Sequence, residues 1–196
     1  MNKLEFINTY LAETAEIAQN ISREAIEKAI EILLEIKSQK GRVFFIGVGG
    51  GAGTGSHATN DFNKIAKISA LCLSDNPSLL TALTNDEGWD SVFKRQLEMH
   101  NFTSRDCLFI YSVGGGTETV SKNLILAINY AKKVGARIIG VVGKDTGATA
   151  KEADVCIIVP CPDDSRRTPH TEDFQLVMDH LLVNILAKIE NEANKE

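Results

Sequence analysis

From residue 42 onward, the chain contains five short runs of mostly apolar residues in which apolar and polar residues do not alternate. Strands that are buried on both faces have this continuous pattern, and they occur in parallel sheets whose two faces are covered by helices. The pattern therefore predicts an α/β fold with five parallel strands. The expected strands are residues 42–47, 70–73, 107–111, 137–142 and 155–159.

Segments with helical spacing separate these runs, so each strand is expected to be followed by a helix. This alternation predicts a three-layer α/β/α sandwich around a doubly wound sheet, with one domain over residues 41–196. In such a sheet, ligands bind at the carboxyl ends of the strands, so functional residues are expected directly after each strand. The expected helices are residues 54–66, 76–98, 117–134, 145–152 and 170–192.

The first 40 residues are expected to form a helical arm. Leu4, Ile7 and Leu11 recur at helical spacing, and a second apolar series follows between Ile26 and Ile36. Because an apolar stripe must be covered by other protein, this arm has to pack on the sheet or on another subunit. Residues 1–40 are therefore predicted to be the oligomerisation arm of a homo-oligomer.

The charge and the cysteine content exclude several classes of protein. The 196-residue chain has 21 Lys and Arg against 26 Asp and Glu, a net charge of −5, which argues against a nucleic-acid partner. The four cysteines form no Cys-x-x-Cys pair and are expected to be reduced thiols. The N-terminus does not resemble a signal peptide and no window holds 18 apolar residues, so we expect a cytoplasmic protein with no membrane partner.

A glycine-rich loop, Gly47-Val-Gly-Gly-Gly-Ala-Gly-Thr-Gly55, follows the first expected strand and precedes a helix. Glycines let the backbone approach a ligand closely, and the N–H groups at a helix N-terminus favour an anion. Gly49, Gly50 and Gly51 are therefore candidate ligand-binding residues. The loop lacks the ending of a Walker motif, and only Asp75 supports a dinucleotide site, so no nucleotide cofactor is expected.

A second loop of the same kind, Ser112-Val-Gly-Gly-Gly-Thr-Glu-Thr119, follows the third expected strand. Ser112 and Thr117 would supply hydroxyl groups, and Gly114 would leave the backbone open to a ligand. Capping of the next helix by Thr117 is compatible with this role. Two such loops at one edge of a sheet predict that the ligand is a phosphorylated small molecule.

Three titratable residues stand out near these loops. His57 and Asp61 are four residues apart on the helix after the first loop, so they share a face and suit a divalent metal or a proton-transfer pair. A simple surface contact between them is an equally good interpretation of that spacing. His180 lies beside an apolar stripe in the last helix, where a hydrogen-bonded core histidine is the plainer interpretation.

Residues 84–96, between the two loops, read Thr-Asn-Asp-Glu-Gly-Trp-Asp-Ser-Val-Phe-Lys-Arg-Gln. Together with the loops, this stretch resembles the sugar isomerase (SIS) domain family, in its phosphoheptose isomerase branch, over about residues 5–190. The resemblance implies a flavodoxin-like SIS sheet, a homotetramer with shared sites, and conversion of sedoheptulose 7-phosphate to D-glycero-D-manno-heptose 7-phosphate. It also implies that Asn85 and Asp86 contact sugar hydroxyls.

The same resemblance implies a zinc site and a catalytic pair. The family's metal-ligand histidine and catalytic glutamate correspond to His57 and Asp61 here. The glutamine and histidine of its last helix correspond to Glu172 and His180. All four residues would then hold zinc, with Asp61 as the base and His180 as its acid partner. The family's glutamate is replaced by Asp61 and its glutamine by Glu172, and both replacements keep an oxygen ligand.

One geometric condition limits this ligand set. Eight residues of helix rise about 12 Å, so Glu172 and His180 cannot both reach one metal ion from one straight helix. Either the last helix begins after Glu172, or the two residues come from different subunits.

The chain also departs from the family's phosphate loop. Residues 112–117 read Ser-Val-Gly-Gly-Gly-Thr where the family has Ser-Thr-Ser-Gly-Asn-Ser, and Gly51 replaces the serine of the first loop. Backbone N–H groups, Arg166 or Arg167 are then expected to bind the phosphate. The alternative function is a non-catalytic SIS module that binds a phosphosugar as a regulatory signal or binds a replication initiator; retention of the acid–base residues argues against it.

Overall fold

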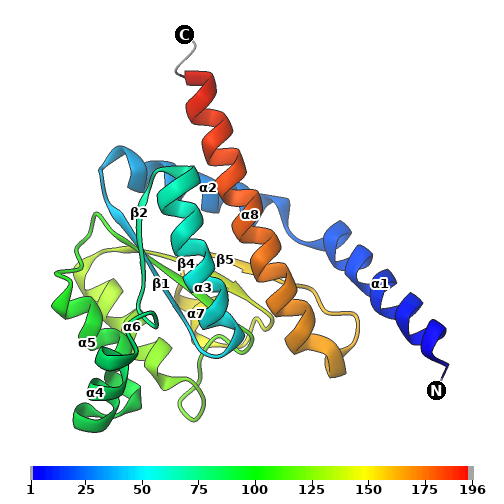
Figure 1. The fold of residues 1–196 in the computed structure, drawn as a ribbon, viewed down its shortest axis with the longest axis horizontal. Helices are drawn as coiled ribbons and strands as arrows, with labels where there is room; N and C mark the ends of the chain where they lie inside the picture. Colours follow the sequence, from blue (N-terminus) through cyan, green and yellow to red (C-terminus); the bar gives the residue numbers. More distant parts are fainter. Residues whose placement is uncertain (1, 194–196) are drawn as a thin grey trace.

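A five-stranded, all-parallel sheet runs through the computed structural model, which describes residues 2–193 (Figure 1). The strand order is β2-β1-β3-β4-β5, and each neighbouring pair is parallel. The predicted three-layer fold and its five strands are confirmed. The strands are β1 (Arg42–Gly47), β2 (Ser69–Cys72), β3 (Cys107–Ser112), β4 (Arg137–Val142) and β5 (Val155–Ile158).

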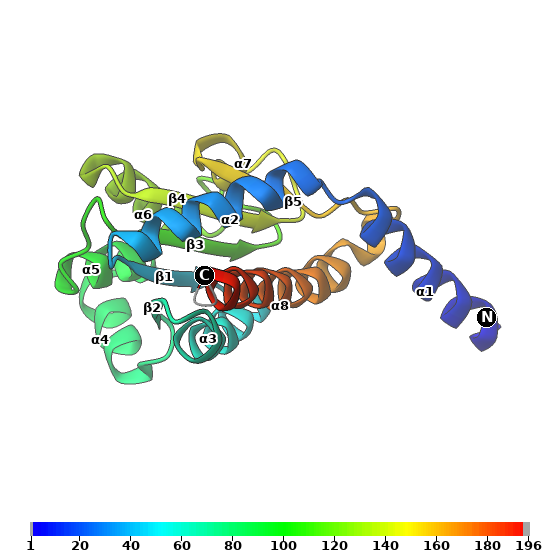
Figure 2. The same cartoon turned by 90° about the horizontal axis from the view of Figure 1, so that it is seen from above.

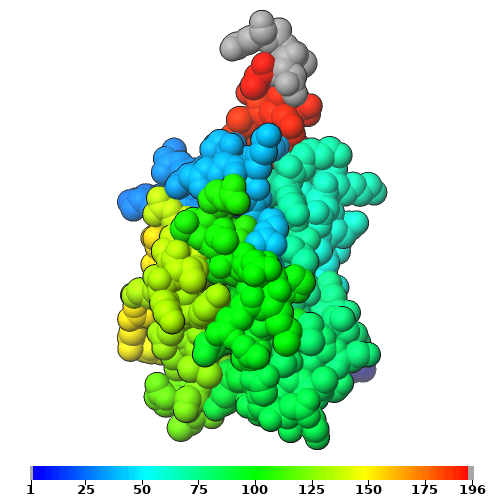
Figure 3. Space-filling view, turned by 90° about the vertical axis from the view of Figure 1, so that its left-hand side faces the viewer, coloured from blue at the N-terminus to red at the C-terminus, as the bar shows by residue number. Residues whose placement is uncertain are grey.

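The helices divide between the two faces of this sheet. Helices α2, α3 and α8 pack on one face, where Phe45 and Tyr111 point, and α4, α5 and α6 pack on the other, where Phe44 and Ile110 point. Figure 3 shows the side of the molecule formed largely by the green segments, with the end of α8 (red) projecting beyond it. The helices are α1 (Lys3–Asn20), α2 (Arg23–Ser38), α3 (Gly50–Asp61), α4 (Pro77–Glu87), α5 (Val92–Met99), α6 (Lys122–Val134), α7 (Ala148–Glu152) and α8 (Arg167–Ala193).

Several helix boundaries differ from the sequence-based expectation, for reasons that lie in the backbone. The segment expected as one helix over 76–98 breaks at Gly88, which has a φ of 85°. The helix expected from residue 117 begins at Lys122, because Gly115 and Gly116 both have positive φ and hold residues 113–121 as an irregular loop. Helix α8 begins at Arg167, before Glu172, so the first way of reconciling Glu172 with His180 is wrong.

The strand order reverses between β1 and β3, which are neighbours in the sheet although β2 lies between them in the chain. The two glycine loops, after β1 and after β3, therefore lie side by side at the carboxyl edge. Their contact is close: a side chain at Gly51 would collide with the carbonyl group of Tyr111. A glycine is thus required at this position for α3 to start against β3.

Helix α1 is the part of the expected arm that reaches away from the sheet, whereas α2 lies along it (Figures 1 and 2). Arg166 fixes α1 to the start of α8 through two hydrogen bonds to Glu13, of 2.8 and 2.6 Å. His170, fully buried, contacts the same carboxylate at 2.9 Å, and the ring of Tyr10 lies 4.4 Å from the His170 ring. None of the helices within residues 2–193 combines the length and the apolar character needed to cross a bilayer.

This contact predicts acid-sensitive docking of α1. Hydrogen bonds from Arg166, and then from His170, lower the pKa of Glu13 from 4.5 to about 2. Since the folded-state pKa lies below the unfolded one, the contact stabilises the docked helix fully above pH 4.5 and is lost as the pH falls towards 2. Hydrogen exchange of the α1 amides should therefore be faster in Glu13→Gln than in the wild type at pH 6, and the difference should shrink below pH 4.5.

The matched control is Glu5→Gln, which removes an exposed carboxylate from the same helix. It should leave exchange of the α1 amides unchanged at both pH values. A Glu13→Gln chain that exchanges like the wild type at pH 6 would show that this contact does not hold α1 in place.

Candidate active site

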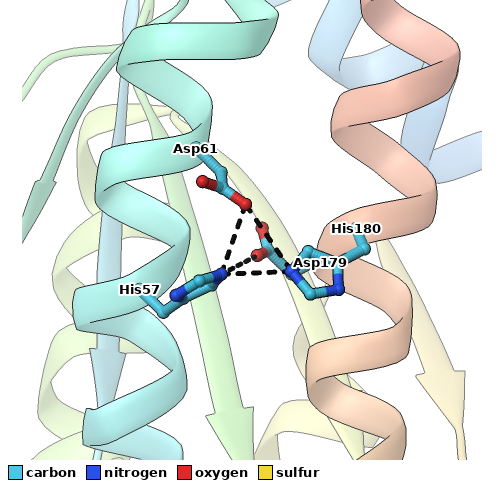
Figure 4. Close-up of side chains that lie close together, drawn as sticks. All are labelled: His57, Asp61, Asp179 and His180. Carbon is cyan, nitrogen blue, oxygen red and sulfur yellow. Dashed lines mark hydrogen bonds and ion pairs between the residues drawn. The ribbon is translucent and has the colours of Figure 1, made fainter.

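Helices α3 and α8 lie side by side on one face of the sheet, and four titratable side chains meet between them (Figure 4). His57 and Asp61 come from α3, and Asp179 and His180 come from α8. One ligand atom of each residue lies within 4.8 Å of the corresponding atoms of the others. The structure therefore brings together three of the residues that the sequence singled out and adds Asp179.

The two histidines face each other directly. Their Nε2 atoms are 3.1 Å apart, and the rings are nearly perpendicular, at 78°. The Asp61 Oδ2 atom lies 3.3 Å from His57 Nε2 and 3.7 Å from His180 Nε2. Both histidines are about half exposed, whereas Asp61 is buried, so the cluster opens to solvent on the histidine side.

Asp179 forms the floor of the cluster and is fully buried. Among residues 2–193, neither of its carboxylate oxygens has a hydrogen-bond partner, and its nearest positively chargeable atom is His57 Nε2, at 3.9 Å. Burial, and then the negative charge of Asp61, raise the pKa of Asp179 to about 7. A carboxylate in such a position needs a cation or a proton to balance it.

The donor set fits a divalent metal ion of the zinc type. Two imidazole nitrogens and two carboxylate oxygens are donors that zinc accepts, and adjacent donors of a tetrahedral zinc site lie about 3.3–3.5 Å apart. Three pairs of atoms in the cluster, at 3.1, 3.3 and 3.7 Å, are close to that spacing. The unpartnered oxygens of Asp179 are a second sign that a cation belongs here.

Glu172, the remaining residue of the expected ligand set, lies outside this cluster. Helix α8 is continuous from Arg167, so Glu172 is two turns before His180 on the same helix. Its carboxylate lies against Gly50, the first residue of α3. A side-chain carbon atom at this position would collide with the carboxylate, so the contact requires glycine. There it faces the N-terminus of α3, which attracts negative charge.

The first glycine loop is therefore already next to an anion. Gly49 has a φ of 62°, which favours glycine, and it precedes α3, while Gly51 is buried against β3. Because the Glu172 carboxylate stands at Gly50, a phosphate there would be repelled. The loop after β3 is the better place for a phosphate.

The second loop has the features of such a place. The Ser112 hydroxyl accepts a hydrogen bond from the N–H group of Gly115, at 3.0 Å, and so orders the turn. A side chain at Gly114 would meet no atom within 4 Å, so the space beside this residue is open. Thr117 is exposed, and its hydroxyl accepts a hydrogen bond from the N–H group of Val120.

The other expected substrate-binding residues lie apart from the cluster. Asn85 and Asp86 are exposed near the end of α4, on the opposite face of the sheet from α8, and are hydrogen-bonded to each other at 2.8 Å. Arg166 forms ion pairs with Glu13 and with Asp163. Arg167 donates hydrogen bonds to the carbonyl group of Gly143 and to Asp164.

Asp179 was not identified from the sequence, although a signal for it exists. It lies three residues before Leu182 and seven before Leu186, so it shares their buried face of α8. A carboxylate on the apolar face of a helix is uncommon and indicates a partner within the fold.

Comparisons with known proteins show the family and the fold of the chain. Residues 8–143 match the family model of the SIS domain. A phosphoheptose isomerase of Sulfurimonas denitrificans is 31% identical over 195 residues, 94% of this chain and 95% of the relative. The lincomycin biosynthesis protein LmbN of Streptomyces lincolnensis is 30% identical over 184 residues, 90% of this chain but 66% of the relative. The structure of phosphoheptose isomerase GmhA from Neisseria gonorrhoeae aligns with a TM-score of 0.82 and 25% identity, over 94% of this chain and 98% of that one.

Proposed function

Since this chain belongs to the SIS domain family, we propose that it is an aldose–ketose isomerase of phosphorylated sugars. Its substrate would be sedoheptulose 7-phosphate, and its product D-glycero-D-manno-heptose 7-phosphate. The observation that carries the proposal is the meeting of His57, Asp61 and His180 between α3 and α8. A protein that only binds a phosphosugar needs no such acid–base set.

The reaction moves a proton between two adjacent carbons through an enediol. In our proposal, the Asp61 carboxylate takes the proton from the first carbon of the ketose and returns it to the second. His180 donates a proton to the carbonyl oxygen of the second carbon as the enediol forms, and it takes the proton of the hydroxyl on the first carbon as the aldose forms. With Nε2 directed at the metal position, Nδ1 would be the nitrogen that carries this proton. The 3.7 Å between Asp61 Oδ2 and His180 Nε2 keeps both residues around one small substrate. The half-exposed histidines leave the substrate a path to the buried carboxylate.

The phosphate would lie at the loop formed by residues 112–117, held by backbone N–H groups and by the hydroxyls of Ser112 and Thr117. The start of α3 lies next to this loop, because Gly51 is in close contact with the carbonyl group of Tyr111. His57 lies six residues after Gly51, about 9 Å along the axis of α3. An extended seven-carbon sugar has seven bonds of about 1.5 Å between its second carbon and the terminal phosphorus, and the zigzag of the chain shortens this span to roughly 9 Å. Binding the distant phosphate would position the reacting carbons at the acid–base pair.

A divalent ion, zinc in our proposal, would be held by His57, Asp61 and His180, and when bound it would polarise the carbonyl group of the substrate. Asn85 and Asp86 remain proposed contacts to sugar hydroxyls, from the exposed end of α4. Because α4 packs on the face of the sheet opposite α8, such contacts would be made to a substrate bound by another subunit or after movement of α4.

We also propose a cytoplasmic homotetramer. Large apolar side chains are exposed on α1 and on α8 beside His180, which is typical of a surface that another subunit covers. The four cysteines are free, in keeping with a reducing compartment. The exposed residues on the two helices are Leu4, Phe6, Ile7, Leu11, Leu176, Val177 and Leu181.

The test is isomerase turnover of the full chain on sedoheptulose 7-phosphate, with the assembly's mass measured by light scattering on the same sample. We expect turnover that is lost on chelation and returns with added zinc. Phosphate-free sedoheptulose is the matched control and should be turned over at least 100-fold less efficiently. Turnover of neither sugar, under conditions where the phosphosugar binds tightly, would refute the proposal.

That last outcome would favour the alternative, a non-catalytic phosphosugar-binding module. One observation supports it: the loop after β3 has Val113 and Gly114 at the two positions where the family's phosphate loop carries further hydroxyls. The acid–base cluster between α3 and α8 argues against it.

A further inference from the structure

We propose that Asp179, rather than Glu172, is the fourth ligand of the divalent cation, so that the metal centre is completed within one subunit. This inference rests on the proposed function, because the isomerase assignment supplies the expectation of a metal. It concerns a residue that the family resemblance does not point to.

The position of Asp179 is the first argument. Its Oδ2 atom lies 3.9 Å from His57 Nε2, and one of its oxygens lies within 4.8 Å of the ligand atoms of His57, Asp61 and His180. Figure 4 shows the four side chains pointing into one space from two helices. Small rotations of these side chains would bring four donors to the spacing of a tetrahedral site.

The second argument is the cost of leaving Asp179 without a partner. Its side chain is fully buried, and both carboxylate oxygens lack a hydrogen bond among the residues that the structure describes. No lysine or arginine among those residues forms an ion pair with it. Burying an unpaired charge is strongly unfavourable, whereas a bound cation would satisfy this carboxylate directly.

The third argument is that Glu172 is engaged elsewhere. Its carboxylate lies against Gly50 at the N-terminus of α3, an electrostatically favourable place for a negative charge. Because α8 is one continuous helix, eight residues separate Glu172 from His180 by about 12 Å along the axis. In this structure the Glu172 carboxylate therefore lies outside the cluster that contains His180, whereas Asp179 lies within it.

The experiment compares two amide substitutions, Asp179→Asn and Glu172→Gln, in the full chain. Cobalt(II) serves as the probe, because its visible absorption reports the ligand geometry, and competition with a chelator gives the affinity. Loss of a partner outside the ligand set already costs about 10–100-fold in metal affinity, so Asp179→Asn should weaken cobalt binding by at least about 100-fold. Glu172→Gln should change it by less than about threefold.

Thermal unfolding of the same samples provides a second readout. The metal-free Asp179→Asn chain should be at least as stable as the metal-free wild type, because it lacks a buried, unpaired carboxylate. At the same zinc concentration, zinc should raise the Tm of the wild type and of Glu172→Gln by clearly more than that of Asp179→Asn.

Three results would overturn the inference: a 100-fold loss in Glu172→Gln, unchanged binding in Asp179→Asn, or no cobalt binding by the wild type. Turnover on sedoheptulose 7-phosphate, measured alongside, separates this inference from the proposed function. Tight cobalt binding that depends on Asp179 without any turnover would refute the isomerase and leave the metal site. Turnover without metal binding would do the reverse.

Discussion

Replacing Asp61 with asparagine is expected to lower kcat for sedoheptulose 7-phosphate by about 10²–10⁴-fold, the usual contribution of a positioned acid or base. The amide has the same shape as the carboxylate but cannot take up a proton. Asn60 donates a hydrogen bond of 2.8 Å to Asp61 Oδ1, and an amide oxygen can still accept it, so the fold should be preserved. The measurement is kcat and KM, with bound zinc determined on the same sample.

Asp61→Glu is the matched control for this substitution. It keeps a carboxylate and introduces the residue that the SIS resemblance places at this position, so it should retain most of the activity. Because Asp61 is also a proposed zinc ligand, the comparison must be made at equal zinc content. An Asp61→Asn enzyme that holds its zinc and turns over like the wild type would exclude Asp61 as the base.

The sheet could be predicted from the sequence because its strands are buried on both faces. Residues such as Phe44 and Phe45, adjacent in β1, point to opposite faces and are both fully buried. A strand of this kind must be apolar throughout, and the run is then visible without knowledge of its neighbours. The five strands were therefore predicted to within one residue at either end.

The helix boundaries were less predictable, because they depend on the backbone conformation of single residues. Gly115, Gly116 and Ser121 all have positive φ, and this keeps the chain irregular up to Lys122. Helical spacing of apolar residues does not reveal where such a loop ends. The start of α8 was also misplaced, since its first turn, including Arg167, has no apolar stripe.

The candidate site was likewise predictable only in part. The pairing of His57 with Asp61 follows from a four-residue spacing on one helix, which sequence reasoning detects directly. Their meeting with His180 depends on how α8 packs against α3, and only the family resemblance indicated it. The resemblance could not indicate Asp179, because this residue belongs to none of the family's motif positions and is distinguished only by its burial between the two helices.

The loop after β3, where we propose that the phosphate binds, can be tested by substitution of Gly114. Aspartate at this position should fold normally, since Gly114 has no positive φ and a side chain there would meet no atom within 4 Å. Its carboxylate would, however, stand beside the proposed phosphate. Two unit charges about 5 Å apart repel by about 3 kcal/mol at an effective dielectric constant of 20. Gly114→Asp should therefore raise KM for sedoheptulose 7-phosphate by about 100-fold or more.

Gly114→Ser is the control, because it adds a side chain of similar size without charge. It also introduces the hydroxyl that the family's phosphate loop carries at this position, so KM should stay the same or fall. Inhibition by inorganic phosphate should weaken in Gly114→Asp in parallel with substrate binding, since both depend on one anion site. If instead Gly114→Asp keeps its KM within threefold while Gly114→Ser is also unaffected, the phosphate does not bind beside this loop, and the N-terminus of α3 becomes the site to test despite the carboxylate of Glu172.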